Sequence, residues 1–209
     1  LNTPVAVLQG SIEKLLETID APSARARLER MQRVASRLRS ISEGLLDFAR
    51  VRKQKSEPVP LKPLVDEAWS LLALDEKSGA TVFANDVPPS CIVNGNSDRL
   101  VQVFVNILRN ALQAAPATGG KIRVSATPFP ATAGRWWSIA VDDNGPGIPE
   151  DVLPEIFEAF ISTRLDSRGT GLGLTVSEGI IQQHGGTISA SNIKTGGARI
   201  EIRLPEAAS

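Results

Sequence analysis

Two glycine-rich runs in the C-terminal half constrain the fold of this chain most strongly. The first covers residues 142–148 (Asp-Asp-Asn-Gly-Pro-Gly-Ile) and follows an alternating apolar pattern over residues 137–141, which is typical of a strand. Its carboxylates are therefore expected at a strand end, where a pocket can open. Glycine permits backbone conformations and close approaches that other residues obstruct. Taken alone, such a run is more often a structural turn than a binding loop.

The second run covers residues 169–174, with glycines at alternate positions, and a helical pattern continues from it to about residue 183. The start of a helix presents unpaired N–H groups and a positive dipole end, and both favour a bound anion. The spacing does not fit G-x-G-x-x-G, since Leu174 occupies the position of the last glycine, and no Gly-Lys-Ser/Thr is present. The signatures of Ser/Thr/Tyr kinases are also missing. The sequence therefore argues against a dinucleotide enzyme, a P-loop protein and that kinase fold.

A third element, over residues 98–111, carries an apolar stripe at helical spacing. Asn106 and Asn110 lie one turn apart on the same side of this predicted helix. Asparagine is a middling helix former, so two at this spacing indicate a role beyond helix formation. Amide oxygens suit Mg²⁺, which usually keeps some of its waters and bridges to phosphates.

In this order, the asparagine helix and the two glycine runs resemble the N, G1 and G2 boxes of the sensor histidine kinases, within the GHKL superfamily of Bergerat-fold ATPases. Residues 156–160 (Ile-Phe-Glu-Ala-Phe) resemble the F box at the base of the ATP lid. Residues 180–188 and 196–205 resemble the C-terminal pattern of the family. The resemblance covers nearly the whole chain, and several ordered motifs are more specific than any one of them.

The resemblance implies that the chain binds ATP with Mg²⁺. Asp143 would accept a hydrogen bond from the exocyclic amine of adenine, with a turn-capping aspartate as the alternative. Asn110 would bind Mg²⁺, with Asn106 supporting it near the phosphates. Gly145 and Gly147 would let the backbone approach the base.

A second group of residues would contact the phosphates from the lid and the following helix. The resemblance gives this role to Gly169, Thr170, Gly171, Leu172 and Gly173. Arg164 would donate charge-assisted hydrogen bonds to the γ-phosphate, and Arg168 is a second candidate. A solvated lid arginine is the alternative for both.

The first 55 residues predict a helical hairpin. The first helix carries an apolar stripe with spacings of three and four: Val5, Leu8, Ile12, Leu15 and Ile19. The second, over residues 24–55, carries another: Met31, Val34, Leu38, Ile41, Leu45 and Phe48. Two helices cannot bury stripes of this length against each other alone, so a homodimer forming a four-helix bundle is expected. The alternative is a monomeric hairpin packed on its own C-terminal domain.

The expected fold class is α+β in three parts. The hairpin (residues 1–55) would serve dimerisation and phosphotransfer, and a proline-containing linker (56–60) would precede the ATP-binding domain (61–209). Strands interleaved with helices on one face of a mixed sheet predict an α/β sandwich for that domain, which the resemblance identifies as the Bergerat fold. The cationic second helix is most simply a solvated face. As a docking surface it would suit the acidic receiver domain of a response regulator.

Charge and composition narrow the partners and the compartment. Lys+Arg equals Asp+Glu at 23 each, so no net basic charge favours nucleic acid or an anionic membrane. The single cysteine, Cys91, is expected to be a small buried residue, and it favours a reducing compartment. No apolar run approaches the roughly 20 residues of a membrane span. The expected location is the cytoplasm, with attachment of the full-length protein to the inner membrane left open.

The acceptor histidine of the family sits in a run reading His-Glu/Asp-x-x-Thr/Asn-Pro, and residues 1–4 match only the end of that run. The acceptor is therefore expected just before Leu1, and the chain as given is expected to bind ATP without phosphorylating itself. Its one histidine, His184, matches a non-acceptor position and is expected to end a helix. Thr3 would match the residue that orients water for phosphatase activity, with a helix N-terminal residue before Pro4 as the alternative.

The expected function is that of a two-component sensor histidine kinase, which passes the γ-phosphoryl of ATP to a histidine and then to an aspartate of a response regulator. ATP-hydrolysing relatives carry a general-base glutamate where this chain has Asn106, and asparagine cannot take a proton from water. The closing strand has Ala198-Arg199 where many members have threonine, which puts a side-chain contact to the adenine region in doubt. Two alternatives stay open: a catalytically silent nucleotide-binding scaffold for a response regulator, and a hydrolase of the wider superfamily.

Overall fold

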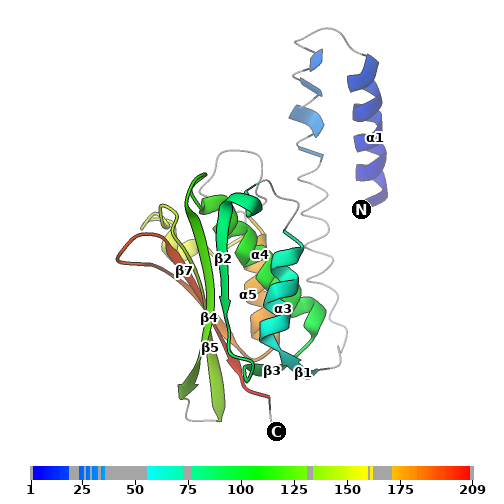
Figure 1. Cartoon of the computed structure of the whole chain (residues 1–209). Coiled ribbons are helices and arrows are strands. Elements are labelled where there is room, and N and C mark those ends of the chain that lie inside the picture. Colours follow the sequence, from blue (N-terminus) through cyan, green and yellow to red (C-terminus); the bar gives the residue numbers. More distant parts are fainter. Residues whose placement is uncertain are drawn as a thin grey trace.

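The computed structural model describes residues 2–18, most of 24–35, 56–72, 77–130, 134–159, 161 and 171–207. Among these residues the principal sheet has five strands in the order β2–β4–β5–β7–β6 (Figure 1). Their bounds are β2 (Thr81–Asp86), β4 (Gly120–Pro130), β5 (Arg135–Asp143), β6 (Thr187–Asn192) and β7 (Ala198–Pro205). β2 and β4 are parallel, and the other neighbours are antiparallel. The predicted mixed sheet is confirmed.

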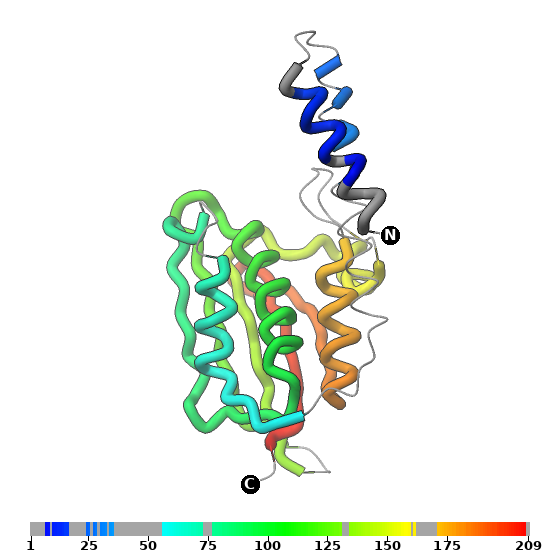
Figure 2. The backbone as a smooth tube through the Cα atoms, turned by 90° about the vertical axis from the view of Figure 1, so that its right-hand side faces the viewer, coloured from blue at the N-terminus to red at the C-terminus, as the bar shows by residue number. Residues whose placement is uncertain are grey.

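Three helices cover one face of this sheet: α3 (Leu61–Ser70), α4 (Ser97–Ala114) and α5 (Gly173–Gln183). Figure 2 shows them side by side, with α4 in the middle. Asn96 caps α4 by accepting a hydrogen bond from the Arg99 N–H at 3.0 Å. The stripe of α4 that faces the sheet is buried: Leu100, Val103, Phe104, Ile107, Leu108, Ala111 and Leu112. This burial confirms the apolar stripe predicted for this helix and leaves its asparagines on another side.

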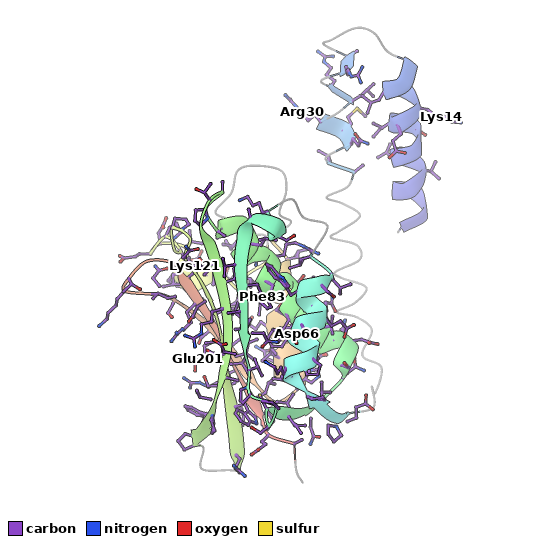
Figure 3. All side chains as sticks on the ribbon, viewed as in Figure 1. Lys14, Arg30, Asp66, Phe83, Lys121 and Glu201 are labelled. Atoms are coloured by element: carbon purple, nitrogen blue, oxygen red, sulfur yellow. The ribbon has the colours of Figure 1, made fainter. Side chains whose placement is uncertain are left out.

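The opposite face of the sheet is polar, because alternate residues of β5 and β7 point away from the core. Arg199 donates to both carboxylate oxygens of Asp142 at 2.7 Å. Glu201, labelled in Figure 3, accepts hydrogen bonds from Arg203 and Ser138. The bond from Arg203 is the main reason why the pKa of Glu201 lies below its usual value.

A second, two-stranded sheet closes one end of the sandwich. β1 (Glu57–Pro60) pairs antiparallel with β3 (Ile92–Gly95), and the Ala207 N–H donates to the Ile92 carbonyl. Residues 57–60 were expected in a linker, but in the structure they form a strand of the C-terminal fold. Cys91 is fully buried beside this sheet, and burial raises the pKa of its thiol to about 12.

Helix α3 ends at Ser70, with Leu71 as its C-cap residue. Its Trp69 ring stacks on that of Phe83, with ring centroids 4.3 Å apart (Phe83 is labelled in Figure 3). This contact fastens α3 to the edge strand β2. Two short 3-10 turns, η1 (Ser78–Ala80) and η2 (Leu153–Glu155), complete the described elements.

The N-terminal hairpin is described in part. α1 (Asn2–Thr18) is the predicted first helix, and the described residues between 24 and 35 are helical. Ile12 of α1 is buried against Leu28 and Ala35. Other apolar side chains of this region are 44 to 66% exposed: Val7, Leu8, Leu15, Met31 and Val34. The predicted continuation to residue 55 lies outside the described residues. Within those residues, no helix combines the length and apolar character needed to cross a membrane.

His184 ends α5, as predicted, and ties it to the start of α4. Its Nδ1–H donates to the Ile180 carbonyl at 2.7 Å, while Nε2 accepts from the Asn96 N–H at 3.0 Å. Because a backbone N–H can only donate, Nε2 must be the acceptor and the proton sits on Nδ1. The imidazole therefore links the C-terminal end of α5 to the N-terminal end of α4.

Gly95→Ala is expected to break this tie. An alanine Cβ would lie 2.5 Å from His184 Cδ2 and 2.9 Å from Leu100 Cδ1, so the imidazole would have to move. We expect a loss of about 1–3 kcal/mol in the free energy of unfolding, measured by urea denaturation. The control is Gly79→Ala, where a Cβ meets nothing within 4 Å. A loss of equal size in both variants would contradict the contact.

Candidate functional site

Asp143, the last residue of β5, is held by backbone N–H groups from two directions. Its Oδ1 accepts hydrogen bonds from Gly145 at 2.8 Å and from Ala198 at 3.3 Å. Burial is the main reason why the pKa of Asp143 lies above its usual value, and the two N–H bonds oppose this effect. The bonds fix the orientation of the carboxylate in a partly dry setting, as a hydrogen-bond acceptor for a ligand requires.

The two glycines that follow are required by close approaches. An added Cβ on Gly145 would lie 2.7 Å from the Ala114 carbonyl oxygen, so this turn packs directly on the end of α4. Gly147 has a φ of +83°, and an added Cβ would lie 2.8 Å from Asn192 Oδ1. The predicted glycine run is therefore pressed against α4 on one side and β6 on the other.

Asn144 fastens the same run to the start of β4. Its Nδ2 donates to the Gly119 carbonyl at 2.9 Å, and its Oδ1 accepts from the Lys121 N–H at 2.7 Å. Its own N–H donates to the Lys121 carbonyl at 3.2 Å. From the sequence, Asn144 was expected only as part of the glycine run. Its place between aspartate and glycine is a turn signal that could have indicated such an anchor.

Asn106 joins α4 to the first turn of α5. Its Nδ2 donates to the Gly173 carbonyl at 3.2 Å and approaches Ser177 Oγ at 3.5 Å. Ser177 is fully buried and donates to the same carbonyl at 2.8 Å. Ser177 was not singled out from the sequence, although it lies one helical turn after Gly173. Together the two side chains fix the start of α5 against the middle of α4.

Asn110 lies between the two glycine-rich segments. Along α4 it is one turn after Asn106, which contacts Gly173, and one turn before Ala114, which contacts Gly145. Its side chain is exposed. The structure thus brings the predicted residues of both runs to one side of α4, with an accessible carboxamide between them.

The start of α5 is suited to an anion. Gly171 has a φ of +67°, Leu172 is the N-cap residue, and Gly173 opens the helix. The Leu172 side chain makes no capping bond there, and the first turn of a helix has N–H groups without intrahelical acceptors and a positive dipole end. Three predicted phosphate contacts, Arg164, Gly169 and Thr170, lie outside the described residues, as does the second candidate, Arg168. Thr3 lies near the start of α1, and its side chain is likewise not described.

A nucleotide with magnesium fits these donor and acceptor groups. The carboxylate and the glycine turn form one end, and the helix start with two carboxamides forms the other. The described residues contain no cluster of three or more His, Cys, Asp or Glu that could hold a metal ion by itself. Mg²⁺ bound to phosphates needs only one or two protein ligands, and the exposed Asn110 oxygen could serve as one of them.

Asn106→Asp is expected to loosen the junction between α4 and α5. Aspartate has no N–H to donate, and its oxygen would face the Gly173 carbonyl oxygen. We expect a loss of about 1–3 kcal/mol in the free energy of unfolding, measured by urea denaturation. The matched change is Gln102→Glu on the same helix, since Gln102 accepts from Arg99 through Oε1 and glutamate can keep that bond. Equal stability of the two variants would contradict this role of Asn106.

Comparisons with known proteins agree with this geometry. The family described as "Histidine kinase-, DNA gyrase B-, and HSP90-like ATPase" matches residues 95–208. Hybrid signal transduction histidine kinase D of Dictyostelium discoideum is 32% identical over 98% of this chain and 14% of its own length. Sensor histidine kinase ZraS of Escherichia coli O157:H7 is 31% identical over 98% of this chain and 44% of its own length.

A solved structure also matches the whole chain. Full-length ShkA in complex with AMPPNP superposes with a TM-score of 0.73 at 24% identity, covering 100% of this chain and 44% of that one. At this identity the likeness concerns the fold. The chain spans less than half the length of each of these three proteins. Because the family match covers more than half of the chain, the chain belongs to the family of histidine kinase-, DNA gyrase B- and HSP90-like ATPases.

Proposed function

We propose that this chain is the catalytic core of a two-component sensor histidine kinase that binds ATP along one side of α4. The observation that carries the proposal is the placement of both glycine segments on that helix. Gly145 packs on Ala114 and Gly173 contacts Asn106, with Asn110 between them. A nucleotide laid along α4 would have its base at the Asp143 end and its phosphates at the α5 end.

At the base end, Asp143 would accept a hydrogen bond from the exocyclic amine of adenine. Its Oδ1 already serves two backbone N–H groups, so Oδ2 is the oxygen proposed to face the ligand. Partial burial strengthens such a bond because water competes less. Gly145 and Gly147 would allow the backbone close to the ring.

At the phosphate end, Gly171, Leu172 and Gly173 would present the N–H groups of the first turn of α5. The Asn110 oxygen would hold Mg²⁺, which supplies charge neutralisation to the phosphate oxygens. Arg164, Gly169 and Thr170 are proposed as further phosphate contacts from the resemblance alone.

The proposed reaction is phosphoryl transfer rather than hydrolysis. The Asn106 amide is occupied with the Gly173 carbonyl, and it has no basic atom to take a proton from water. The bond between the γ-phosphorus and the bridging oxygen of ATP would break, leaving ADP, while a bond forms from that phosphorus to a histidine nitrogen. That histidine is proposed ahead of Leu1 in the hairpin, and an aspartate of a response regulator would next receive the phosphoryl group. In phosphatase activity toward the regulator, water would attack the phosphorus of the phosphoaspartate and the aspartate carboxylate would leave with release of phosphate. Thr3 is proposed to orient that water.

The hairpin is proposed to dimerise with a second copy into a four-helix bundle. Ile12, Leu28 and Ala35 are buried within one hairpin, whereas Leu8 and Met31 are about half exposed. A second hairpin would cover this remaining apolar surface. The proposed location is the cytoplasm.

Calorimetry with ADP and with AMPPNP, each with and without Mg²⁺, tests the nucleotide site. The unmutated chain is expected to bind both, and Mg²⁺ is expected to tighten AMPPNP binding. Asn110 is exposed and alanine is a good helix former. Asn110→Ala is therefore expected to retain nucleotide binding, but Mg²⁺ should no longer tighten the binding of AMPPNP. If the unmutated chain binds neither nucleotide, the kinase proposal fails, and with it the silent nucleotide-binding scaffold.

A chemical test separates the reaction classes. The chain, together with the natural sequence ahead of Leu1, is incubated with γ-labelled ATP and Mg²⁺. A label on the protein that survives alkali but is lost in acid is expected, because the phosphorus–nitrogen bond of phosphohistidine is labile in acid. Steady phosphate release without any such label would favour the hydrolase. Nucleotide binding with neither label nor release would favour the silent scaffold.

A further inference from the structure

Asn192, the last residue of β6, binds both backbone groups of a residue 44 positions earlier in the chain. Its Oδ1 accepts from the Ile148 N–H at 2.7 Å, and its Nδ2 donates to the Ile148 carbonyl at 2.7 Å. This is the pair of bonds that a neighbouring strand would make. A single side chain therefore joins the end of the first glycine run to the β6–β7 hairpin.

The amide also lies against the turn itself. An added Cβ on Gly147 would be 2.8 Å from Asn192 Oδ1 and 3.5 Å from the Gly197 carbonyl oxygen. Gly147 has a positive φ of +83°. The conformation of the turn and the position of the Asn192 amide thus depend on each other.

The same hairpin holds the other end of the run. The Ala198 N–H donates to Asp143 Oδ1, and Gly197 packs so closely on the Asp143 carbonyl that a Cβ there would overlap it. The hairpin has a tight turn, in which the Ile193 N–H donates to the Gly197 carbonyl at 2.9 Å. Residues 143–148, which contain every predicted contact to the base, are therefore bracketed by one hairpin at both ends.

We infer that Asn192 is a positioning residue for the base end of the proposed nucleotide site, acting through the backbone N–H and carbonyl of Ile148. This inference rests on the proposed function. A carboxamide is suited to the task because it offers one donor and one acceptor side by side, matching the carbonyl and the N–H of a single residue, here Ile148. Aspartate would keep the bond to the Ile148 N–H and set an oxygen against the Ile148 carbonyl. Alanine would lose both bonds.

If Asn192 positions only the base end of the site, its replacement should lower nucleotide affinity by a factor that does not depend on the number of phosphates. Asn192→Ala is expected to weaken AMP, ADP and AMPPNP by the same factor, roughly 10-fold, the size that follows from two lost neutral hydrogen bonds. Asn110→Ala is expected to do the opposite, with a larger loss for AMPPNP with Mg²⁺ than for AMP. Comparison of the two variants therefore distinguishes an effect on the base end of the site from an effect on the phosphate end, and the exchange of the Ile148 N–H reports whether the base end itself has changed.

The experiment measures the three dissociation constants by calorimetry for the unmutated chain, Asn192→Ala, Asn192→Asp and Ser191→Ala. Ser191 is the matched control, since it precedes Asn192 in the same strand and is also exposed. It is expected to bind all three nucleotides like the unmutated chain. Backbone hydrogen exchange of Ile148 is followed in parallel. Its exchange should accelerate in Asn192→Ala and stay slow in Asn192→Asp, which keeps the acceptor. If Asn192→Ala does not fold, Asn192→Asp carries the comparison of nucleotide affinities, and an equal loss for the three nucleotides then supports the inference.

Each result decides the inference. An equal loss for all three nucleotides with faster Ile148 exchange supports it. Nucleotide affinities of Asn192→Ala and Asn192→Asp equal to those of the unmutated chain overturn it and leave the proposed function intact. A loss that grows with the number of phosphates also overturns it. If the unmutated chain binds no nucleotide, the proposed function fails first and the inference fails with it.

Discussion

Asp143→Asn is expected to remove nucleotide binding while the ligand-free protein becomes no less stable. Asparagine can keep both backbone bonds through its Oδ1, because the Gly145 and Ala198 N–H groups need only an acceptor. Its Nδ2 would then face the adenine amine, and two donors would oppose each other. The loss of a charge-assisted bond together with this unpaired donor predicts at least ~100-fold weaker binding.

The effect on stability follows from the direction of the pKa shift. The folded-state pKa of Asp143 lies above its usual value, chiefly because of burial. Between the usual pKa and the raised one, the folded state holds more protons than the unfolded state, so stability falls as the pH rises through this window. Above the window the ionised carboxylate continues to disfavour the folded state. Asparagine carries no charge, so the variant is expected to match or exceed the unmutated chain at neutral pH.

The matched control is Asp142→Asn, the same chemical change one residue earlier on the opposite face of the sheet. It breaks the ion pair with Arg199, which is partly exposed and so stabilises the fold by at most about 1 kcal/mol. Calorimetry with ADP and urea denaturation at neutral pH measure both properties. Asp142→Asn should bind ADP normally and be slightly less stable. If Asp143→Asn also binds ADP normally, Asp143 is not the base contact.

The residues of the candidate site that the sequence predicts are those defined by local patterns. Asn106 and Asn110 follow from helical spacing, and Asp143 follows from a strand that ends in a glycine run. Ser177 could also be predicted from a local pattern, because it is one helical turn after Gly173. Asn192 could not, since its partner Ile148 is 44 residues away and nothing near Asn192 in the sequence indicates that pairing.

Strand β1 shows why the fold was also predicted incompletely. Pro58 and Pro60 suggested a linker, because proline cannot donate to a strand ladder. In the structure they alternate with Val59, and the Leu61 N–H donates to the Cys91 carbonyl. Pro58 and Pro60 thus occupy the alternate positions of β1 that donate no backbone N–H to β3, and an edge strand tolerates proline at such positions. Which positions these are depends on the pairing with β3, which lies more than thirty residues later in the sequence.

Gly197→Ala is expected to be among the most damaging single substitutions in this domain. Gly197 has a φ of +94°, which is strained for alanine, and an added Cβ would overlap the Asp143 carbonyl oxygen and lie 2.8 Å from the Asp143 carbonyl carbon. Backbone atoms cannot rotate away as a side chain can, so either β5 or the hairpin must shift. We expect a loss of about 3–5 kcal/mol in the free energy of unfolding, the sum of strain and overpacking. A shift of the strand end that carries Asp143 should also weaken ADP binding.

Gly196→Ala separates the two causes. Gly196 is the preceding residue, with a φ of +104°, but a Cβ there meets nothing within 4 Å. This variant has the strain without the overlap, so it should lose about 1–2 kcal/mol and bind ADP normally. Urea denaturation and calorimetry of both variants measure the difference. Equal losses in the two would mean that the hairpin does not press on Asp143. A larger loss in Gly197→Ala, with weakened ADP binding, would make this contact a structural requirement of the base site.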